Sequence, residues 1–158
     1  MIRHTTHRTT RLALQWLFLL VAGSGALAQS TTAAPAKAAK PNQSDARAIE
    51  KVIRDQIDAF GRDDAKRAFA HAAPDIRRMF GTPDDFMRMV RDGYAPVYRA
   101  SSIFFLKLET IEGFTLQTVQ LVDSEGRVWI ARFAMRQQPD KSWKVAGCEL
   151  VATRSLAT

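Results

Sequence analysis

The sequence has little cysteine and little histidine, and both shortages exclude classes of site. Cys148 is the only cysteine, so no disulfide can form within one chain. Two of the three histidines lie near the amino terminus, which leaves His71 alone in the rest of the chain and excludes a histidine-based metal cluster. The eight glycines are scattered and form no phosphate-binding loop. The sequence therefore predicts no metal site and no cofactor.

These two isolated residues have ordinary structural interpretations. Cys148 lies in an apolar strand pattern, where a cysteine usually is a small buried side chain. A reactive or dimer-forming thiol is the alternative. His71 falls at the end of a predicted helix, where an interaction with the helix dipole is the favoured role and general-base catalysis the alternative.

Long hydrophobic runs are scarce as well, and the one that is present lies near the amino terminus. Residues 12–22 are apolar except for Gln15, three arginines precede them, and Ala26-Leu27-Ala28 follows as a small-x-small sequence. This order is typical of a secretory signal peptide. We therefore expect cleavage after Ala28 and a mature protein that is periplasmic or secreted.

The length of that run bears on membrane attachment. As a helix it would rise about 16 Å, whereas the hydrocarbon core of a bilayer is about 30 Å thick. We therefore expect no stable membrane anchor after cleavage, with an uncleaved signal anchor as the alternative. Residue 29 is glutamine, which excludes a lipid-anchored cysteine at the new amino terminus.

Removal of residues 1–28 lowers the net charge. The full chain has 23 basic and 16 acidic residues, and three arginines leave with this segment, so the mature chain carries +4. Residues 29–43 are rich in Ala, Pro, Thr and Lys and lack core-forming side chains, which predicts a disordered tether. Residues 44–158 are nearly charge-balanced and long enough for one domain with its own core. This balance does not favour a nucleic-acid partner.

The first half of the domain has the periodicity of helices. An amphipathic helix is predicted from Ser44, its cap, to Gly61, its end. Its apolar positions are Ile49, Val52, Ile53, Ile57 and Phe60. Asp63 or Asp64 caps a second helix that carries Ala72 and is closed by Pro74, and one more turn ends at Gly81.

A further helix begins at Thr82-Pro83-Asp84-Asp85, which combines an N-cap, a proline at the first helical position and acids in the first turn. Phe86, Met89 and Val90 form its predicted buried face, and Gly93 ends it. Because Ala95 precedes a proline, residues 94–99 are expected to be extended.

From Ser102 the period changes to two, which predicts strands. The expected segments are a first strand, a turn at Glu112-Gly113, a strand over 114–122, a hairpin loop over 123–126, a strand that carries Trp129, a turn over 139–142 and a strand over 143–151. The predicted fold is α+β, with the amino-terminal helices packed on one face of a curved four-strand antiparallel meander.

Few residues suggest a site. Tyr94, Tyr98 and Arg99 offer polar groups between helices and sheet, and Arg132 and Glu149 interrupt apolar strands, so we expect all five to contribute to ligand binding. Arg132 and Glu149 each either need a partner of opposite charge in the core or lie on a solvent-exposed face of the sheet. Asp58, beside the apolar stripe of the first helix, and Tyr98 are the candidates for catalysis.

The residues also carry a family resemblance. The segment "QIDAFGRDDAKRAFAHAAPDIRRMFGTPDDFMRMVRDGYAPVYR" resembles the bacterial family called domain of unknown function 4864, and the likeness covers roughly residues 48–151. The helices and the closing strand "DKSWKVAGCEL" resemble the nuclear transport factor 2-like, or SnoaL-like, cone fold. The resemblance implies a cone-like fold and no catalytic residues.

Two classes of function remain. The favoured one is a non-catalytic binding module for a small apolar ligand or a protein partner. The alternative is a small acid-base enzyme, of the isomerase or hydro-lyase type, that uses a carboxylate and a tyrosine in the cone. A homodimer through the sheet face is a further expectation.

Overall fold

Helices come first and strands second along the chain, as the sequence predicts. A computed structural model describes residues 41–111 and 114–151. The helices are α1 (Gln43–Gly61), α2 (Ala65–Ala70), α3 (Pro74–Phe80), α4 (Pro83–Gly93) and α5 (Ala95–Tyr98). The strands are β1 (Ala100–Ile111), β2 (Phe114–Asp123), β3 (Val128–Gln137) and β4 (Trp143–Val151). The expected signal peptide and the turn at Glu112-Gly113 lie outside the described residues.

The four strands form one antiparallel sheet in the order β1-β2-β3-β4, which confirms the predicted meander. The β2–β3 turn follows from its sequence. Gly126 has a φ of +78° in the β2–β3 hairpin, a conformation that glycine adopts without a steric penalty. Lys141 takes a φ of +66° in the β3–β4 turn. β4 has the predicted bounds.

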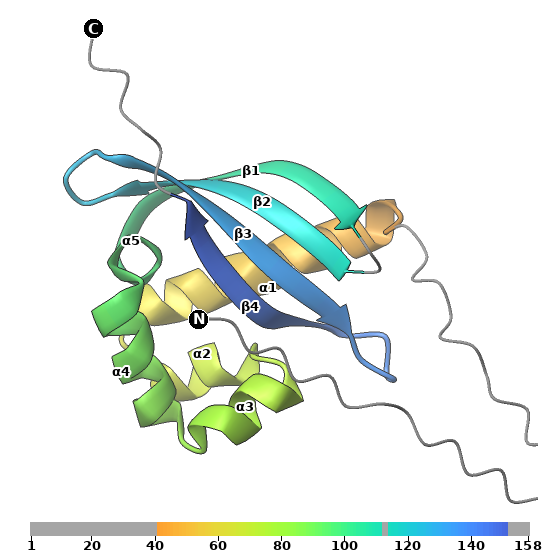
Figure 1. The fold of residues 1–158 in the computed structure, drawn as a ribbon, viewed down its shortest axis with the longest axis horizontal. Helices are drawn as coiled ribbons and strands as arrows, with labels where there is room; N and C mark the ends of the chain where they lie inside the picture. Colours follow the sequence, from red (N-terminus) through yellow and green to blue (C-terminus); the bar gives the residue numbers. More distant parts are fainter. Residues whose placement is uncertain (1–40, 112–113, 152–158) are drawn as a thin grey trace, which may run out of the picture. The chain divides into compact units, whose positions relative to one another are not determined.

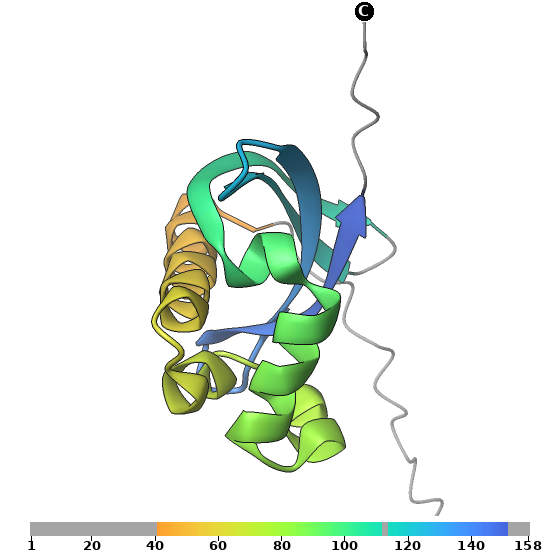
Figure 2. The same ribbon diagram turned by 90° about the vertical axis from the view of Figure 1, so that its left-hand side faces the viewer.

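All five helices lie on one face of the sheet. Figure 1 shows α1 crossing beneath the strands, and Figure 2 shows the sheet curving over it. Alternate residues of β2 and β3, such as Val119, Ala131 and Phe133, are buried against Ile49 and Ile53 of α1. Each of the larger side chains among them, such as Val, Ile and Phe, contributes roughly 1.5–3 kcal/mol by leaving water. Among the helices that the structure describes, none is long and apolar enough to cross a membrane.

The amino terminus of α1 is capped by Asn42 rather than by the expected Ser44. Asn42 Oδ1 accepts hydrogen bonds from the backbone N–H groups of Ser44 (2.8 Å) and Asp45 (3.0 Å), and Asp45 Oδ2 accepts from the N–H of Asn42 (3.1 Å). This reciprocal pair is a capping box. Asn42 takes the role because its backbone is still extended, whereas Ser44 already lies within the helix.

Helices α2 and α4 begin where the sequence predicts, whereas α3 begins at Pro74, the residue that was expected to close the second helix. The side chains of Asp64 and Thr82 cap α2 and α4, and Gly81, with a φ of +71°, follows α3. α2 ends at Ala70, so Ala72 lies beyond it, in contrast to the prediction. The reason is a competing partner, because the chain from His71 to Ala73 pairs with the edge of β4 at Val145, through N···O distances of 2.9 and 2.8 Å.

The expectation of an extended chain over residues 94–99 is wrong, because Ala95–Tyr98 forms α5. The backbone N–H of Val97 and that of Tyr98 donate to the carbonyl of Tyr94, at 2.8 and 2.9 Å. Val97 and Tyr98 are both buried in this turn. Their burial outweighs the preference of a residue before proline for extended backbone.

Candidate functional site

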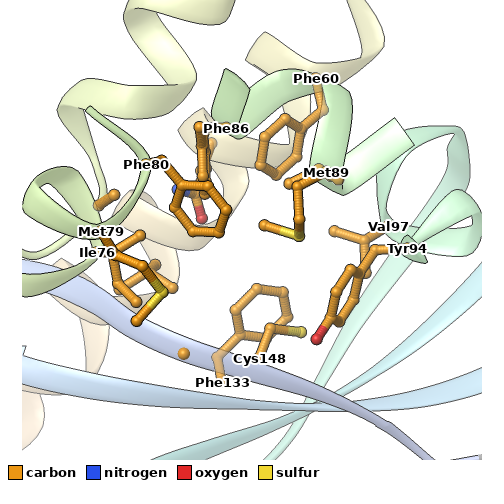
Figure 3. Close-up of a pocket in the computed structure, with 15 residues that line it drawn as sticks. Phe60, Ile76, Met79, Phe80, Phe86, Met89, Tyr94, Val97, Phe133 and Cys148 are labelled. Carbon is orange, nitrogen blue, oxygen red and sulfur yellow. The ribbon is translucent and has the colours of Figure 1, made fainter. Parts of the chain in front are cut away.

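An apolar cavity of about 230 Å³ lies between the helices and the strands β3 and β4. Figure 3 shows its side chains pointing inward from both layers. The lining residues are Gln56, Phe60, Ala72, Ile76, Met79, Phe80, Phe86, Met89, Val90, Tyr94, Val97, Phe133, Val145, Gly147 and Cys148. None of these residues carries a charge, so the wall suits an uncharged, apolar molecule.

Aromatic rings form the rigid part of the wall. The ring of Phe86 on α4 lies 5.9, 5.5 and 5.6 Å from the rings of Phe60, Phe69 and Phe80, measured between centroids. These are tilted and edge-on contacts, which are favourable arrangements for aromatic pairs. The cluster joins α1, α2, α3 and α4, and it fixes the helical side of the cavity.

Helix α3 places its apolar side chains on this cavity and buries them only in part. Ile76, Met79 and Phe80 all line the cavity, and no residue of α3 is buried. Met79 is 72% exposed. The helix packs on α4 through the Phe80–Phe86 ring contact, and Asp75 adds an exposed ion pair with Arg136 of β3. An apolar helix face thus lies beside the cavity, with Ile76 and Phe80 partly buried against the core and Met79 exposed.

The polar groups of the wall are few. Tyr94 and Cys148 lie on one side of the cavity (Figure 3), and Gln56 of α1 also lines it. Burial, together with the nearby charge of Glu149, raises the pKa of the Cys148 thiol to about 12. Cys148 is therefore a neutral thiol at physiological pH. Its side chain lines the wall and is partly buried, where the strand pattern predicts a small buried side chain.

α4 presents a different set of residues to the core from the one expected. Phe86, Met87 and Val90 are its buried residues, whereas Met89 is partly exposed and lines the cavity. Met89 thus belongs to the cavity wall, because its side chain leaves the helix on the side that faces the sheet across the open space (Figure 3).

Of the predicted ligand-binding residues, Tyr94 alone lines the cavity. Tyr98 is buried in a separate group with Arg91, Arg99 and Asp63. The Tyr98 hydroxyl donates to Asp63 Oδ1, Arg91 Nε donates to that hydroxyl (3.1 Å), and Arg99 Nη2 donates to Asp63 Oδ2 (2.9 Å). The guanidinium of Arg99 also lies 4.2 Å from the centre of the Tyr98 ring.

This group connects the turn after α1 to α5. Asp63 has a φ of +57°, a left-handed conformation that aspartate tolerates better than most residues. The hydrogen bonds from Tyr98 and then Arg99 lower the pKa of Asp63. A general base works best with a pKa near the operating pH, so this carboxylate is poorly suited to proton transfer. Its geometry supports a structural role.

The other predicted site residues lie on exposed surfaces. Arg132 and Glu149 are cross-strand partners on the outer face of the sheet, away from the helices, with an Nη2···Oε2 distance of 2.7 Å. They therefore pair with each other at a solvent-exposed position. Asp58 is exposed on α1 and lines a shallow groove beside Ser101, without reaching Tyr98 or the apolar cavity.

His71 lies at the C-cap position of α2, at the carboxyl end of the helix. Burial lowers its pKa most, while the charge of Asp55 acts in the opposite direction. Within residues 41–111 and 114–151, no three or more His, Cys, Asp or Glu side chains group as a metal site would require.

Sequence reasoning missed Gln56, Met79 and Asp63. A signal existed for Gln56, because it is a polar residue three positions after Ile53, within the apolar stripe of α1. Met79 followed the pattern of an ordinary core position, and its cavity contact depends on how α3 packs. Asp63 was expected only as a possible cap, since its partner Tyr98 lies 35 residues away.

Comparison with protein families matched residues 42–158, which include every described helix and strand. No curated protein matches the chain. The match covers most of the sequence and the whole of the fold described above. The chain therefore belongs to the family described as Domain of unknown function (DUF4864).

Proposed function

We propose that this protein is a non-catalytic binding module and that it holds a small apolar ligand in the cavity between α3, α4 and the sheet. The observation that carries the proposal is the apolar face of α3, which lies beside the cavity and is only partly buried, with Met79 exposed. Exposing such side chains to water is unfavourable, and a ligand of matching polarity would cover them. We further propose that helices and curved sheet form a nuclear transport factor 2-like cone, in which this cavity is the interior.

Charge at the cavity mouth should weaken ligand binding. Met79→Glu places a carboxylate beside the cavity at an already exposed position, so the fold should tolerate it. We expect octan-1-ol, measured by isothermal titration calorimetry, to bind Met79→Glu about tenfold more weakly, or about 1.4 kcal/mol.

The control is Phe104→Glu, which puts the same charge at a 54% exposed position on β1. Its affinity should equal that of the unmodified protein. Equal weakening in both variants, or no saturable binding by the unmodified protein, would contradict the proposal.

A second copy of the chain is a second candidate partner, favoured by the outer face of the sheet. Phe104, Ile111 and Phe114 share this face, and Phe114 is 63% exposed. Arg132 and Glu149 on the same face already neutralise each other, so a second copy meets no unpaired charge from them. Two sheets packed face to face would cover these side chains.

Analytical ultracentrifugation tests this dimer. The mature chain should sediment as a dimer and Phe114→Glu as a monomer, because the new charge would be buried against its partner. Met79→Glu, on the opposite side of the sheet, should remain dimeric. A monomer at every concentration would refute the dimer without affecting the ligand proposal.

The proposed location is the periplasm or the exterior of the cell, with cleavage after Ala28. The support is the charged, apolar and small-residue order of residues 1–28. Amino-terminal sequencing of the protein from its native host should begin at Gln29. Full-length chain in the cytosol would contradict this proposal.

A further inference from the structure

Gln56 is a polar residue at the centre of the apolar helix face. Its side chain is only 2% exposed, between the buried residues Ile53 and Phe60 of α1. Its Nε2 donates a hydrogen bond to the backbone carbonyl of Ala68 in α2, at 3.0 Å. A carbonyl oxygen can only accept, so this bond determines which end of the amide is nitrogen and which is oxygen.

The oxygen of the same amide, Gln56 Oε1, lies in a different environment from the nitrogen. No donor among the described residues makes a hydrogen bond to Gln56 Oε1. The one enclosed side-chain polar atom without a partner there is Thr110 Oγ1, so Gln56 Oε1 retains some accessible surface. Gln56 lines the cavity and is otherwise buried, hence that surface opens into the cavity. The apolar cavity thus has one buried acceptor on its α1 side.

The remaining wall determines the charge of a matching ligand. No described lining residue is charged, and the Cys148 thiol is neutral. A carboxylate or phosphate would lose its hydration without gaining a cation, and its oxygens would also face the Gln56 oxygen. A neutral group that donates a hydrogen bond satisfies both the wall and the acceptor.

We propose that the ligand is a neutral, apolar molecule that ends in a hydroxyl or N–H group, and that this group donates a hydrogen bond to Gln56 Oε1. The proposal rests on the proposed function and adds the chemical class of the ligand. The size follows from the volume. A cavity of about 150 Å³ accommodates benzene, so about 230 Å³ corresponds to a ligand of roughly nine non-hydrogen atoms.

A matched pair of ligands separates the hydrogen bond from apolar contact. Octan-1-ol and 1-methoxyheptane have the same composition, but the ether has no donor. We expect the unmodified protein to bind octan-1-ol about tenfold more tightly than the ether, measured by calorimetry. Octanoate should bind more weakly than the alcohol. Equal binding of alcohol and ether, as expected if water satisfies Gln56 Oε1, would overturn this inference while leaving the proposed function intact.

Variants assign the preference to a residue. Gln56→Met keeps the length of the side chain and removes the acceptor, so the two ligands should then bind within about twofold of each other. Tyr94→Phe removes the hydroxyl of the wall and should keep the preference. The inference fails if Tyr94→Phe abolishes the preference or if Gln56→Met retains it.

A spectroscopic measurement serves if Gln56→Met does not fold. The side-chain amide resonances of Gln56 in the unmodified protein should shift with octan-1-ol and much less with the ether. Equal shifts would overturn the inference. Saturable binding of neither ligand would instead refute the proposed function on which it rests.

Discussion

At the scale of single residues, Asp123 organises the hairpin between β2 and β3. Its Oδ2 accepts hydrogen bonds from Trp129 Nε1 (2.9 Å) and Arg127 Nε (2.8 Å), and its Oδ1 accepts from the backbone N–H groups of Glu125 and Arg127. Burial alone would raise the pKa of Asp123, but these hydrogen bonds outweigh it and hold the pKa well below its usual range. The carboxylate therefore stabilises the folded state in its charged form.

Asp123→Asn should destabilise the protein at neutral pH, and the loss should shrink in acid. The folded-state pKa lies below the unfolded value of about 3.9, so the contribution is present above that value and disappears as the pH falls through the folded pKa. Urea unfolding at neutral pH and at about pH 3 measures the difference. Glu125→Gln, at an exposed carboxylate of the same hairpin, should change little. A loss of equal size at both pH values would contradict this role.

The sequence predicts the turn over residues 123–126 but not the part that Asp123 plays in it. Gly126 marks the hairpin, since the left-handed position is a local requirement. The contact with Trp129 arises only once β2 and β3 pair in register, which the local pattern does not specify. Roles of single residues that depend on contacts between distant parts of the chain were therefore missed. The hydrogen bond between Tyr98 and Asp63 is another example.

At the scale of elements, Trp143 links the start of β4 to the start of α1. It is 8% exposed, and its Nε1 donates to Asp45 Oδ1 at 3.1 Å. Asp45 is also the acidic member of the α1 capping box. The tryptophan thus joins the last strand to the first helix, through contacts between residues 98 positions apart.

Trp143→Ala should lower the free energy of unfolding by roughly 3–5 kcal/mol, because it removes a large buried ring. Trp143→Phe keeps much of the packing and loses the hydrogen bond to Asp45, so it should cost about 1 kcal/mol. Chemical denaturation of the three proteins provides the comparison. A loss below about 1 kcal/mol for the alanine variant would show that this ring contributes little to the core.

The strands and the caps of α2 and α4 were predictable, because their signals are local. Thr82 and Asp64 cap helices through groups three residues away, and β4 begins and ends as its alternation indicates. The conformation of residues 94–99 was not predictable from the local sequence, because the burial of Val97 and Tyr98 determines it. The tertiary environment overrode a local rule there.

At the scale of the whole molecule, the cavity exists because elements that are far apart in the chain meet around it. α1 supplies Gln56, α3 and α4 supply Met79 and Met89, and β4 supplies Cys148. No local sequence pattern predicts that these elements meet. The sequence therefore favoured a binding module for an apolar ligand but placed its site at residues that lie apart in the structure. Tyr94 is the predicted residue that lies at the cavity.

Methyl resonances of methionine test ligand binding in this cavity, with controls in the same molecule. Met79 and Met89 line the cavity, whereas Met87 and Met135 are buried in the core and do not line it. In a titration of ¹³C-methyl-methionine-labelled protein with octan-1-ol, we expect saturable shifts of the Met79 and Met89 methyl groups and nearly constant positions for Met87 and Met135. Equal shifts of all four resonances, or no saturable shift of Met79 and Met89, would contradict a ligand site between α3, α4 and the sheet.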